Sequence, residues 1–423
     1  MKIELINTGS ELLLGRVLNT HQQWLCRCLS DLGYEVERQV CIADDGPSIE
    51  AAVRESLSHS ADLVITTGGL GPTSDDITRD LIAKLIGRKL VLDRRIQTQI
   101  ESYFISRQRP VPPKSEVQAM VPEGALVLSN ANGTAPGLAI ELDPNPFSAE
   151  KKPSLLILLP GPPRELRPMF LDTALPLIRR KLPLDRKFVC RTYRVVGLGE
   201  SMVENKIAPS LAQLVKEGLE IGYCARIGEV DVRLTARGEN AEPTVDEAEK
   251  IVTGLLGSLI FGREDELLES AVVKLLAEHK KTLALAESCT GGMIAHRITN
   301  VPGASAVLMA GLVTYSNDSK KSILGVRPKT LTAHGAVSEE TAREMAEGAR
   351  ALMKTDFAIS VTGIAGPSGG TPAKPVGTVF IALAMEGQTV VQRQFNNFDR
   401  ETFKFVTSQQ ALNLIRLTVL KQP

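Results

Sequence analysis

The sequence predicts an α/β protein with two α/β domains joined by a small α+β module. Strand-length apolar segments alternate with segments of helical periodicity near both ends of the chain, and glycine-rich turns follow several of these strands. The chain has 423 residues, whereas a single core rarely grows past about 250–300 residues. We therefore expect three regions, at residues 1–175, 176–250 and 251–423.

The first region indicates a parallel, doubly wound sheet. Its apolar segments of strand length lie at residues 2–7, 35–42, 61–66 and 155–159. Apolar residues recur with helical spacing at 19–32 and 47–57, and further helices are expected from Ile77 and after Asp93, a typical cap residue. Strands that alternate with helices favour parallel pairing with helices on both faces of the sheet.

The middle region has a different pattern. Residues 188–196 and 229–235 alternate apolar and polar residues as half-buried strands do, and a helical stretch starts at Met202. Residues 238–249 are polar and charged, so we expect them to form a linker to the last region.

The last region repeats the alternation of strands and helices. Strands are expected at residues 282–286 and 356–361, and Ser338 is placed to cap a long helix. Residues 374–385 and 388–394 predict a hairpin around Gly387. The region is therefore a second α/β domain.

Composition excludes several classes of protein. Lysine plus arginine equals aspartate plus glutamate at 49 each, so no general field attracts nucleic acid or an anionic membrane surface. The six cysteines form no CxxC pair, and no apolar run is long enough to span a membrane. Without a signal peptide at the start, we expect a cytoplasmic protein that binds neither nucleic acid nor membrane.

Three glycine-rich loops stand out in the first region. They comprise residues 7–11, 66–73 and 132–137, and a later PGPPRE segment adds Gly161. Glycines at the carboxyl ends of parallel strands let a phosphate approach backbone N–H groups. The residues expected to bind substrate are Thr8, Gly9, Ser10, Gly68, Gly69, Gly71, Pro72, Thr73, Asn132, Gly133, Thr134 and Gly161.

An acidic pair follows the second of these loops. Asp75 and Asp76 precede a helix beside the expected phosphate cradle, and together with Glu11 they suit a divalent cation. An ordinary tight turn with Asp75 as helix cap is the more frequent explanation of one such loop alone. Three loops that converge on one sheet edge favour a ligand site instead.

A second candidate site opens at residues 286–292, with the sequence AESCTGG. Three nucleophile types, Ser288, Cys289 and Thr290, stand in a row at a strand-to-helix turn. Gly291 and Gly292 provide N–H groups for an oxyanion, and the following helix adds its positive end. A helix start also lowers thiol pKa values, so the residues alone leave the identity of the nucleophile open.

Two further segments complete this second site. Tyr315 and Lys320 end one strand and start a helix, where a desolvated lysine can act as base for a serine. A glycine-dense loop at residues 361–370 follows another strand, and Arg400 begins the last helix, where it can meet a phosphate. The residues expected to bind substrate here are Thr290, Gly291, Gly292, Thr362, Gly363, Ala365, Gly366 and Arg400.

Several motifs resemble the CinA family. TGGLGPTSDDITRD at residues 67–80, with NTGSELL, NGTAPG and LPGPPRE, is similar to the amino-terminal CinA domain, whose fold resembles molybdopterin-binding proteins. AESCTGG, GLVTYSNDSK, HGAVSEET and TGIAGPSGG match the carboxy-terminal domain over about residues 267–415. The segments around residues 197–201 and 228–230 also resemble the CinA middle domain; ordinary packing is the favoured explanation for them, and a spacer role or an oligomer contact is the functional alternative.

The resemblance implies two hydrolytic activities. One is metal-dependent hydrolysis of ADP-ribose to AMP and ribose 5-phosphate, and the other is deamidation of nicotinamide mononucleotide to nicotinic acid mononucleotide and ammonia. The family's catalytic serine, tyrosine and lysine fall on Ser288, Tyr315 and Lys320. A second arginine, common four residues after Arg400, is Lys404 here, a weaker fit for bidentate phosphate binding.

Other functions remain open from the sequence. The front domain is also compatible with molybdopterin binding, and the family name suggests a non-enzymatic role in competence. One or both sites of a two-domain member can be inactive. We expect a homodimer that acts in pyridine nucleotide salvage, with a divalent cation needed only at the front site.

Overall fold

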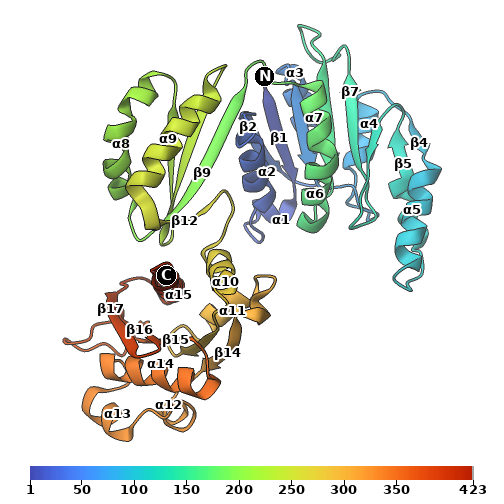
Figure 1. Ribbon diagram of the computed structural model, residues 1–423. Coiled ribbons are helices and arrows are strands. Elements are labelled where there is room, and N and C mark those ends of the chain that lie inside the picture. Colours follow the sequence, from blue (N-terminus) through green and yellow to red (C-terminus); the bar gives the residue numbers. More distant parts are fainter. Residues whose placement is uncertain (422–423) are drawn as a thin grey trace. The chain divides into compact units, whose positions relative to one another are not determined.

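The computed structural model describes residues 1–421, apart from the side chain of Lys114, and the chain divides into two compact units. The first spans Met1–Val189 and the second begins at Cys190 (Figure 1). Both contain a sheet covered by helices, which confirms the α/β class expected from the sequence. Within the described residues no helix is both long and apolar enough to cross a bilayer.

A six-stranded sheet organises the first unit, in the order β2-β1-β3-β8-β7-β6. The four strands β2, β1, β3 and β8 are parallel, and β7 and β6 extend the sheet with antiparallel pairs. The strands are β1 (Ile3–Thr8), β2 (Val36–Ile42), β3 (Leu63–Thr67), β6 (Leu126–Leu128), β7 (Gly137–Leu142) and β8 (Ser154–Leu159), and β4 (Leu90–Leu92) pairs separately with β5 (Met120–Pro122).

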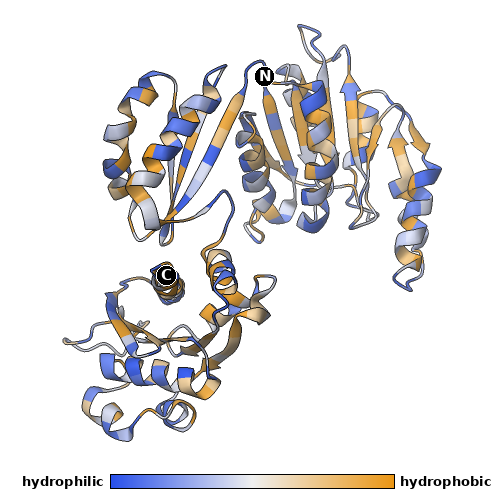
Figure 2. Ribbon diagram, in the orientation of Figure 1, coloured by the Kyte–Doolittle hydropathy of each residue, from blue (hydrophilic) through white to orange (hydrophobic). Residues whose placement is uncertain are grey.

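Helices cover both faces of this sheet, as a doubly wound fold requires. The helices are α1 (Ser10–Leu13), α2 (Thr20–Ser30), α3 (Gly46–Ser58), α4 (Thr78–Leu85), α5 (Arg94–Ile105), η1 (Pro113–Ala119), α6 (Pro163–Met169), η2 (Phe170–Ala174) and α7 (Leu175–Lys181). Each face of the sheet has its own hydrophobic core, and alternate residues of β1 pack into one or the other. Ile3 and Leu5 pack with α2 and α6, whereas Ile6 packs with α3 and α4. Figure 2 shows the hydrophobic residues concentrated on the strands.

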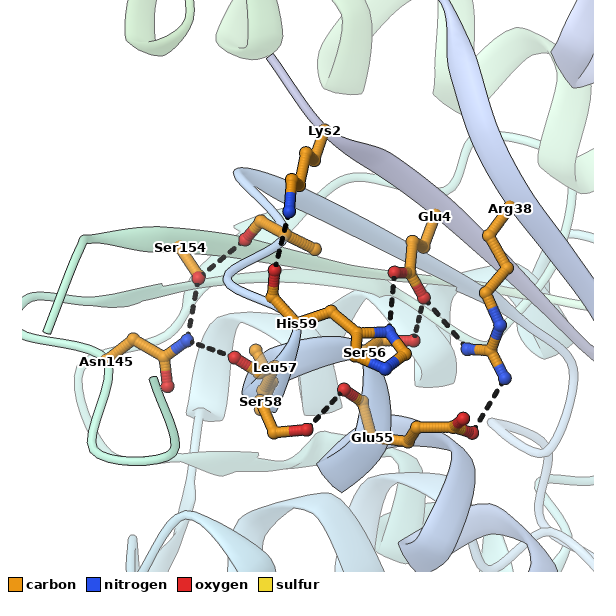
Figure 3. Close-up of polar contacts among 11 residues, drawn as sticks. Lys2, Glu4, Arg38, Glu55, Ser56, Leu57, Ser58, His59, Asn145 and Ser154 are labelled. Carbon is orange, nitrogen blue, oxygen red and sulfur yellow. Dashed lines mark hydrogen bonds and ion pairs between the residues drawn. The ribbon is translucent and has the colours of Figure 1, made fainter. Parts of the chain in front are cut away.

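A buried carboxylate ties the amino-terminal ends of this unit's strands to α3 (Figure 3). Glu4 is 4% exposed and accepts hydrogen bonds from Arg38 (2.9 Å), Ser56 (2.6 Å) and the Nδ1 of His59 (3.2 Å). Burial works against the charged form, but these donors outweigh it and hold the pKa of Glu4 below its ordinary value. The cluster lies at the opposite end of β1 from the glycine-rich loops, so it is part of the scaffold.

The second unit contains two sheets. The first has the order β10-β11-β9-β12, and the second has the order β14-β13-β15-β16-β17. The elements of the first are β9 (Phe188–Val196), α8 (Glu200–Lys216), β10 (Glu220–Arg226), β11 (Glu229–Arg237), α9 (Ala241–Leu256), η3 (Gly257–Leu259) and β12 (Ile260–Arg263).

The second sheet of this unit carries the remaining elements. Its strands are β13 (Leu283–Glu287), β14 (Leu308–Val313), β15 (Phe357–Gly363), β16 (Thr378–Met385) and β17 (Gln388–Phe395). Helices α10 (Leu268–Glu278), α11 (Met293–Thr299) and α15 (Arg400–Val419) bury one face. The other face is covered by α12 (Asn317–Leu324), α13 (Pro328–His334) and α14 (Glu339–Met353), and η4 (Ala304–Ala306) precedes β14. The expected hairpin is confirmed: Met385 pairs with Gln388 around Gly387.

The predicted linker is wrong. Most of residues 238–249 belong to α9, whose buried residues Ala241, Val245 and Ala248 continue at Val252 and Leu256. These five positions are three or four residues apart, so they form one helical stripe despite the charged residues between them. The expectation failed because the charged half of the helix was considered without its apolar second half. The chain passes from β12 to α10 through residues 264–267 instead.

Buried polar contacts join the two sheets of the second unit. Glu229 at the start of β11 accepts hydrogen bonds from Arg194 of β9 and from Gln409 of α15. Arg297 of α11 donates to the same Gln409 and, at 2.7 Å, to Ser408. These four long side chains are at most 8% exposed, so the first sheet of the unit is physically linked to the helix that follows Ser288.

Candidate active sites

The register of the first sheet brings the predicted loops of the first unit together. Asn7 pairs with Thr67, Thr67 pairs with Leu159, and Leu138 at the start of β7 pairs with Leu158 at the end of β8. The loops after β1, β3 and β8 and the loop before β7 therefore lie at one edge of the sheet. This is the edge at which open α/β sheets bind ligands.

A positive φ and a close approach of Thr8 explain one of the glycines at this edge, Gly68, and Gly161 lies in ordinary contact with it. Gly68 has φ +99°, and a Cβ there would lie 2.5 Å from Thr8 Oγ1. A Cβ on Gly161 would lie 3.8 Å from the Gly68 Cα. The backbones after β1, β3 and β8 thus come together around Thr8, Gly68 and Gly161, and a larger residue at position 68 would push them apart.

The acidic pair beside these loops has two different environments. Asp76 Oδ2 accepts hydrogen bonds from the backbone N–H of Thr73, at 2.9 Å, and from its hydroxyl, so this carboxylate holds its own loop. The carboxylate of Asp75 is exposed. Glu11 is exposed on α1.

Carboxylate oxygens are suitable ligands for a divalent cation, but the carboxylate of Asp76 is directed to Thr73. Among the described residues no group of three or more histidine, cysteine or acidic side chains is arranged to hold a metal. The metal site expected from Asp75, Asp76 and Glu11 stays a prediction.

Sequence reasoning missed two residues at this edge. Glu165 at the start of α6 is 8% exposed and accepts a hydrogen bond from Asn130 at 2.8 Å, and a Cβ on Gly133 would lie 2.0 Å from its Oε2. The Nε2 of His21 donates to the carbonyl of Gly161, and burial lowers the pKa of His21. Each lies within or next to a quoted motif, LPGPPRE for Glu165 and the residues after NTGSELL for His21, but nothing in the sequence places it at the site.

In the second unit, the turn after β13 carries the predicted nucleophiles. Ser288 follows the buried Glu287, and its backbone N–H donates to Val361 of β15. The side chain of Lys320 on α12 reaches the same point: its Nζ lies 3.0 Å from Ser288 Oγ, 2.7 Å from the Thr314 carbonyl and 3.3 Å from the Tyr315 carbonyl. The structure therefore brings Ser288 and Lys320 together, 32 residues apart in the chain.

Burial shifts the pKa values of two groups at this site, Lys320 and Cys289. Lys320 is 1% exposed and desolvation lowers its pKa. Burial raises the pKa of the Cys289 thiol to about 12, so it stays protonated near neutral pH. Ser288 therefore lies beside a lysine that loses its proton readily, while Cys289 is a packed thiol.

The expected oxyanion donors in this turn are otherwise engaged. Glu287 is 1% exposed, and its carboxylate accepts hydrogen bonds from the backbone N–H groups of Gly292 (3.0 Å), Ile294 (3.2 Å) and Ala295 (2.8 Å). The N–H of Gly291 donates to the Ser288 carbonyl. The expectation that Gly291, Gly292 and the start of α11 bind the oxyanion is therefore wrong, because an internal carboxylate already occupies the positive end of that helix.

Tyr315 and Arg400 form a pair at the surface of the site. Arg400 at the start of α15 donates to the Tyr315 hydroxyl and to the carbonyl of Gly366, both at 2.9 Å. Tyr315 is 60% exposed, and the contact that it makes with Lys320 runs through its backbone carbonyl. The structure thus places the tyrosine hydroxyl beside Arg400.

Several residues predicted to bind substrate in the glycine-dense loop at residues 361–370 are buried or closely packed. The Thr362 hydroxyl donates to the Ala336 carbonyl at 2.7 Å, and Ala365 is buried. A Cβ on Gly363 would lie 2.9 Å from the Thr378 carbonyl, so that position is closely packed. The Thr290 hydroxyl is fully buried and has no hydrogen-bond partner among the described residues. The substrate-binding roles predicted for these residues stay predictions.

A second cation approaches the nucleophile turn. Lys404 lies one helical turn after Arg400 on α15, and its Nζ would be 3.7 Å from a Cβ on Gly291. Of the two positive side chains on the first two turns of α15, Lys404 therefore lies beside the loop that carries Ser288, and Arg400 contacts Gly366 and Tyr315.

Three sequence models of known families match the chain. The probable molybdopterin binding domain matches residues 4–180, the damage-inducible protein CinA KH domain matches residues 190–262, and the CinA C-terminal domain matches residues 265–419.

The chain also resembles curated proteins and solved structures. It is 44% identical to a CinA-like protein of Akkermansia muciniphila, over 97% of this chain and 96% of that protein. It is 42% identical to a putative competence-damage inducible protein of Caldicellulosiruptor bescii, over 99% of this chain and all of the relative.

Among solved structures, the competence/damage inducible protein CihA of Agrobacterium tumefaciens is 40% identical, with a TM-score of 0.35, and the match covers 37% of this chain and 94% of that one. The protein CinA of Thermoplasma acidophilum is 30% identical, with a TM-score of 0.37, and covers 42% of this chain and 99% of its own. On the full-length relatives at 44% and 42% identity, the chain belongs to the CinA family.

Proposed function

We propose that the second unit deamidates nicotinamide mononucleotide to nicotinic acid mononucleotide and ammonia. The observation that carries this proposal is the placement of Lys320. A neutral lysine has two N–H bonds and one lone pair, and the carbonyls of Thr314 and Tyr315 provide one acceptor for each N–H. The lone pair is then left for the hydroxyl proton of Ser288.

The reaction follows from this arrangement. Lys320 takes the hydroxyl proton as Ser288 Oγ bonds to the amide carbon, and the resulting ammonium returns a proton to the departing nitrogen as the C–N bond breaks. Water then hydrolyses the acyl-serine with the same lysine as base. The backbone N–H groups of Cys289 and Thr290 remain for the oxyanion, because the other N–H groups of residues 288–292 are engaged.

The substrate phosphate is assigned to the cations of α15. Lys404 lies beside the nucleophile turn and Arg400 beside Tyr315 and Gly366, and a nucleotide whose amide reaches Ser288 must place its phosphate some distance away. A substrate that carries both an amide and a phosphate fits these two features together.

Substitution of the three neighbouring nucleophiles tests this proposal. Ser288→Ala and Lys320→Ala are expected to reduce ammonia release from nicotinamide mononucleotide by at least about 1,000-fold, the usual scale for loss of a nucleophile or its base. Cys289→Ala is expected to retain most activity, and iodoacetamide is expected to leave the wild type active. An active Ser288→Ala variant together with an inactive Cys289→Ala variant would replace the serine mechanism by a thiolate mechanism.

We further propose that the first unit hydrolyses ADP-ribose to AMP and ribose 5-phosphate. The convergence of the loops after β1, β3 and β8 around Gly68 supports it, because these loops present backbone to a diphosphate. Molybdopterin binding is the second candidate, favoured by the matching domain model at residues 4–180. Release of AMP from ADP-ribose, measured with and without a divalent cation, supports the hydrolase, whereas pterin binding without AMP release supports the alternative.

A further inference from the structure

A cavity of the first unit is lined by only one of the three predicted loops, that of residues 132–137. It has a volume of about 570 Å³ and is enclosed by α5, by the two residues that follow it and by residues 129–136. This volume is within the range of small-molecule sites. Neither the glycine-rich loops after β1 and β3 nor the acidic pair lines it.

The loop of residues 130–136 separates this cavity from the sheet edge. On one side, Asn130 donates to Glu165, and Gly133 is closely packed against the same carboxylate. On the other side, Asn130, Gly133 and Thr134 line the cavity. The loop of residues 130–136 therefore borders both the sheet edge and the cavity.

The lining suits an aromatic base. Arg107 is the one charged residue among the lining side chains, so the described wall carries a positive charge and no negative one. The other polar lining groups are neutral hydroxyls and amides, such as Ser102, Gln99 and Thr134. Such groups hydrogen-bond the edge of a base and the hydroxyls of a ribose.

A preformed stack supplies a surface for the face of that base. The guanidinium carbon of Arg107 lies 3.7 Å from the centre of the Tyr103 ring. Arg107 also donates to the Tyr103 carbonyl at 3.2 Å and to the Ser106 hydroxyl at 3.3 Å, and both acceptors are neutral. A planar cation held over an aromatic ring, with no acidic partner in the described chain, can stack a base on its outer face.

We propose that this cavity binds the purine nucleoside part of the substrate, with Arg107 and Tyr103 as the stacking pair. The inference rests on the proposed hydrolysis of ADP-ribose, since it assigns the adenosine half to this cavity and the diphosphate to the glycine-rich loops. It also separates recognition of the base from the chemistry at the phosphates.

The test is binding of AMP to the full-length protein, measured by calorimetry, with ribose 5-phosphate as the ligand without a base. Loss of one stacking contact weakens binding by about tenfold. Arg107→Ala and Tyr103→Leu are each expected to raise the Kd of AMP by about that factor and to leave the Kd of ribose 5-phosphate unchanged. Arg95→Ala is the matched control, because Arg95 lies on the same helix and pairs with Asp93.

Several outcomes overturn the inference: no AMP binding by the wild type, unchanged AMP binding in both variants, or equal losses for AMP and ribose 5-phosphate. A circular dichroism melting curve identifies a variant that fails to fold, and the second variant then decides. If the variants lose AMP binding but the wild type does not hydrolyse ADP-ribose, the base site is supported and the proposed hydrolase is contradicted. If both variants hydrolyse ADP-ribose with an unchanged KM, the proposed hydrolase is supported and the base site is contradicted.

Discussion

Lys320 Nζ lies 3.0 Å from Ser288 Oγ at a position where the lysine side chain is 1% exposed. A charged ammonium group loses its hydration when it is buried, and desolvation accordingly lowers the pKa of Lys320 below the ordinary lysine value. The same burial that makes the lysine a base also fixes how the proposed activity depends on pH.

The deamidase rate is expected to rise with pH until Lys320 is deprotonated. The active form lacks the proton, so kcat/KM should fall about tenfold per pH unit below the folded-state pKa of Lys320 and level off above it. That pKa is lowered, so the plateau begins at a lower pH than for an ordinary lysine. Initial rates of ammonia release across the pH range give the profile. Lys320→Arg should be inactive throughout, and a flat profile in the wild type contradicts lysine as the base.

Glu287→Gln is expected to damage the site without touching the substrate. The carboxylate accepts three backbone hydrogen bonds at the start of α11, and a glutamine would turn an NH₂ group toward some of them. A lost charged, buried hydrogen bond costs about 1.5–3 kcal/mol. We expect kcat to fall and the thermal midpoint of the second unit to drop. Glu386→Gln, at an exposed turn, is the control, and equal behaviour of the two variants contradicts this role.

Tyr315→Phe is expected to affect binding more than chemistry. The tyrosine hydroxyl accepts a hydrogen bond from Arg400, and the tyrosine contact with Lys320 uses a backbone carbonyl that phenylalanine retains. Because Tyr315 and Arg400 are both exposed, loss of their hydrogen bond should cost no more than about 1 kcal/mol and raise KM for nicotinamide mononucleotide by up to roughly 5-fold, with a smaller change in kcat. Arg400→Ala should show the same split. A Tyr315→Phe variant with normal KM and abolished kcat would make the hydroxyl a proton carrier.

Glu229→Ala is expected to destabilise the second unit, including the sheet that positions Ser288, although Glu229 itself lies on the other sheet of that unit. The carboxylate is the shared acceptor for Arg194 and Gln409, and removing it leaves a buried guanidinium with one acidic partner fewer. Removing one partner of a buried ion pair costs about 3–5 kcal/mol. Residual deamidase activity after a heat challenge of the full chain reports the loss. Glu239→Ala, at an exposed position nearby, should match the wild type, and similar inactivation of all three proteins contradicts the link.

Glu4→Gln is expected to change how the first unit responds to acid. The pKa of Glu4 is lowered on folding, so its contribution to stability is complete above the unfolded pKa and is lost as pH falls through the folded pKa. Between neutral pH and acid, the wild type should therefore lose stability more steeply than Glu4→Gln, which is less stable at pH 7. Denaturant unfolding followed at several pH values measures both slopes, and Glu55→Gln, which keeps Glu4 and its donors, serves as control.

The amino-acid sequence determined the two α/β regions, the loops and the presence of Ser288 and Lys320, because alternation of apolar segments and glycine turns is local along the chain. It also determined that a helix begins after Asp93, whose side chain accepts the hydrogen bond from Arg95 as a cap does. The charged segment at residues 238–249 was misjudged because its apolar partners lie beyond it, in the second half of α9.

Only the tertiary structure decided which neighbouring groups are chemically different. Ser288 and Cys289 are adjacent in sequence, yet burial raises the pKa of the thiol to about 12, and the side chain of a lysine 32 residues away reaches the serine. Glu287 occupies the helix start that the glycines of the turn were expected to offer to an oxyanion. Desolvation and long-range hydrogen bonds depend on which elements pack together, and no spacing along the chain records that.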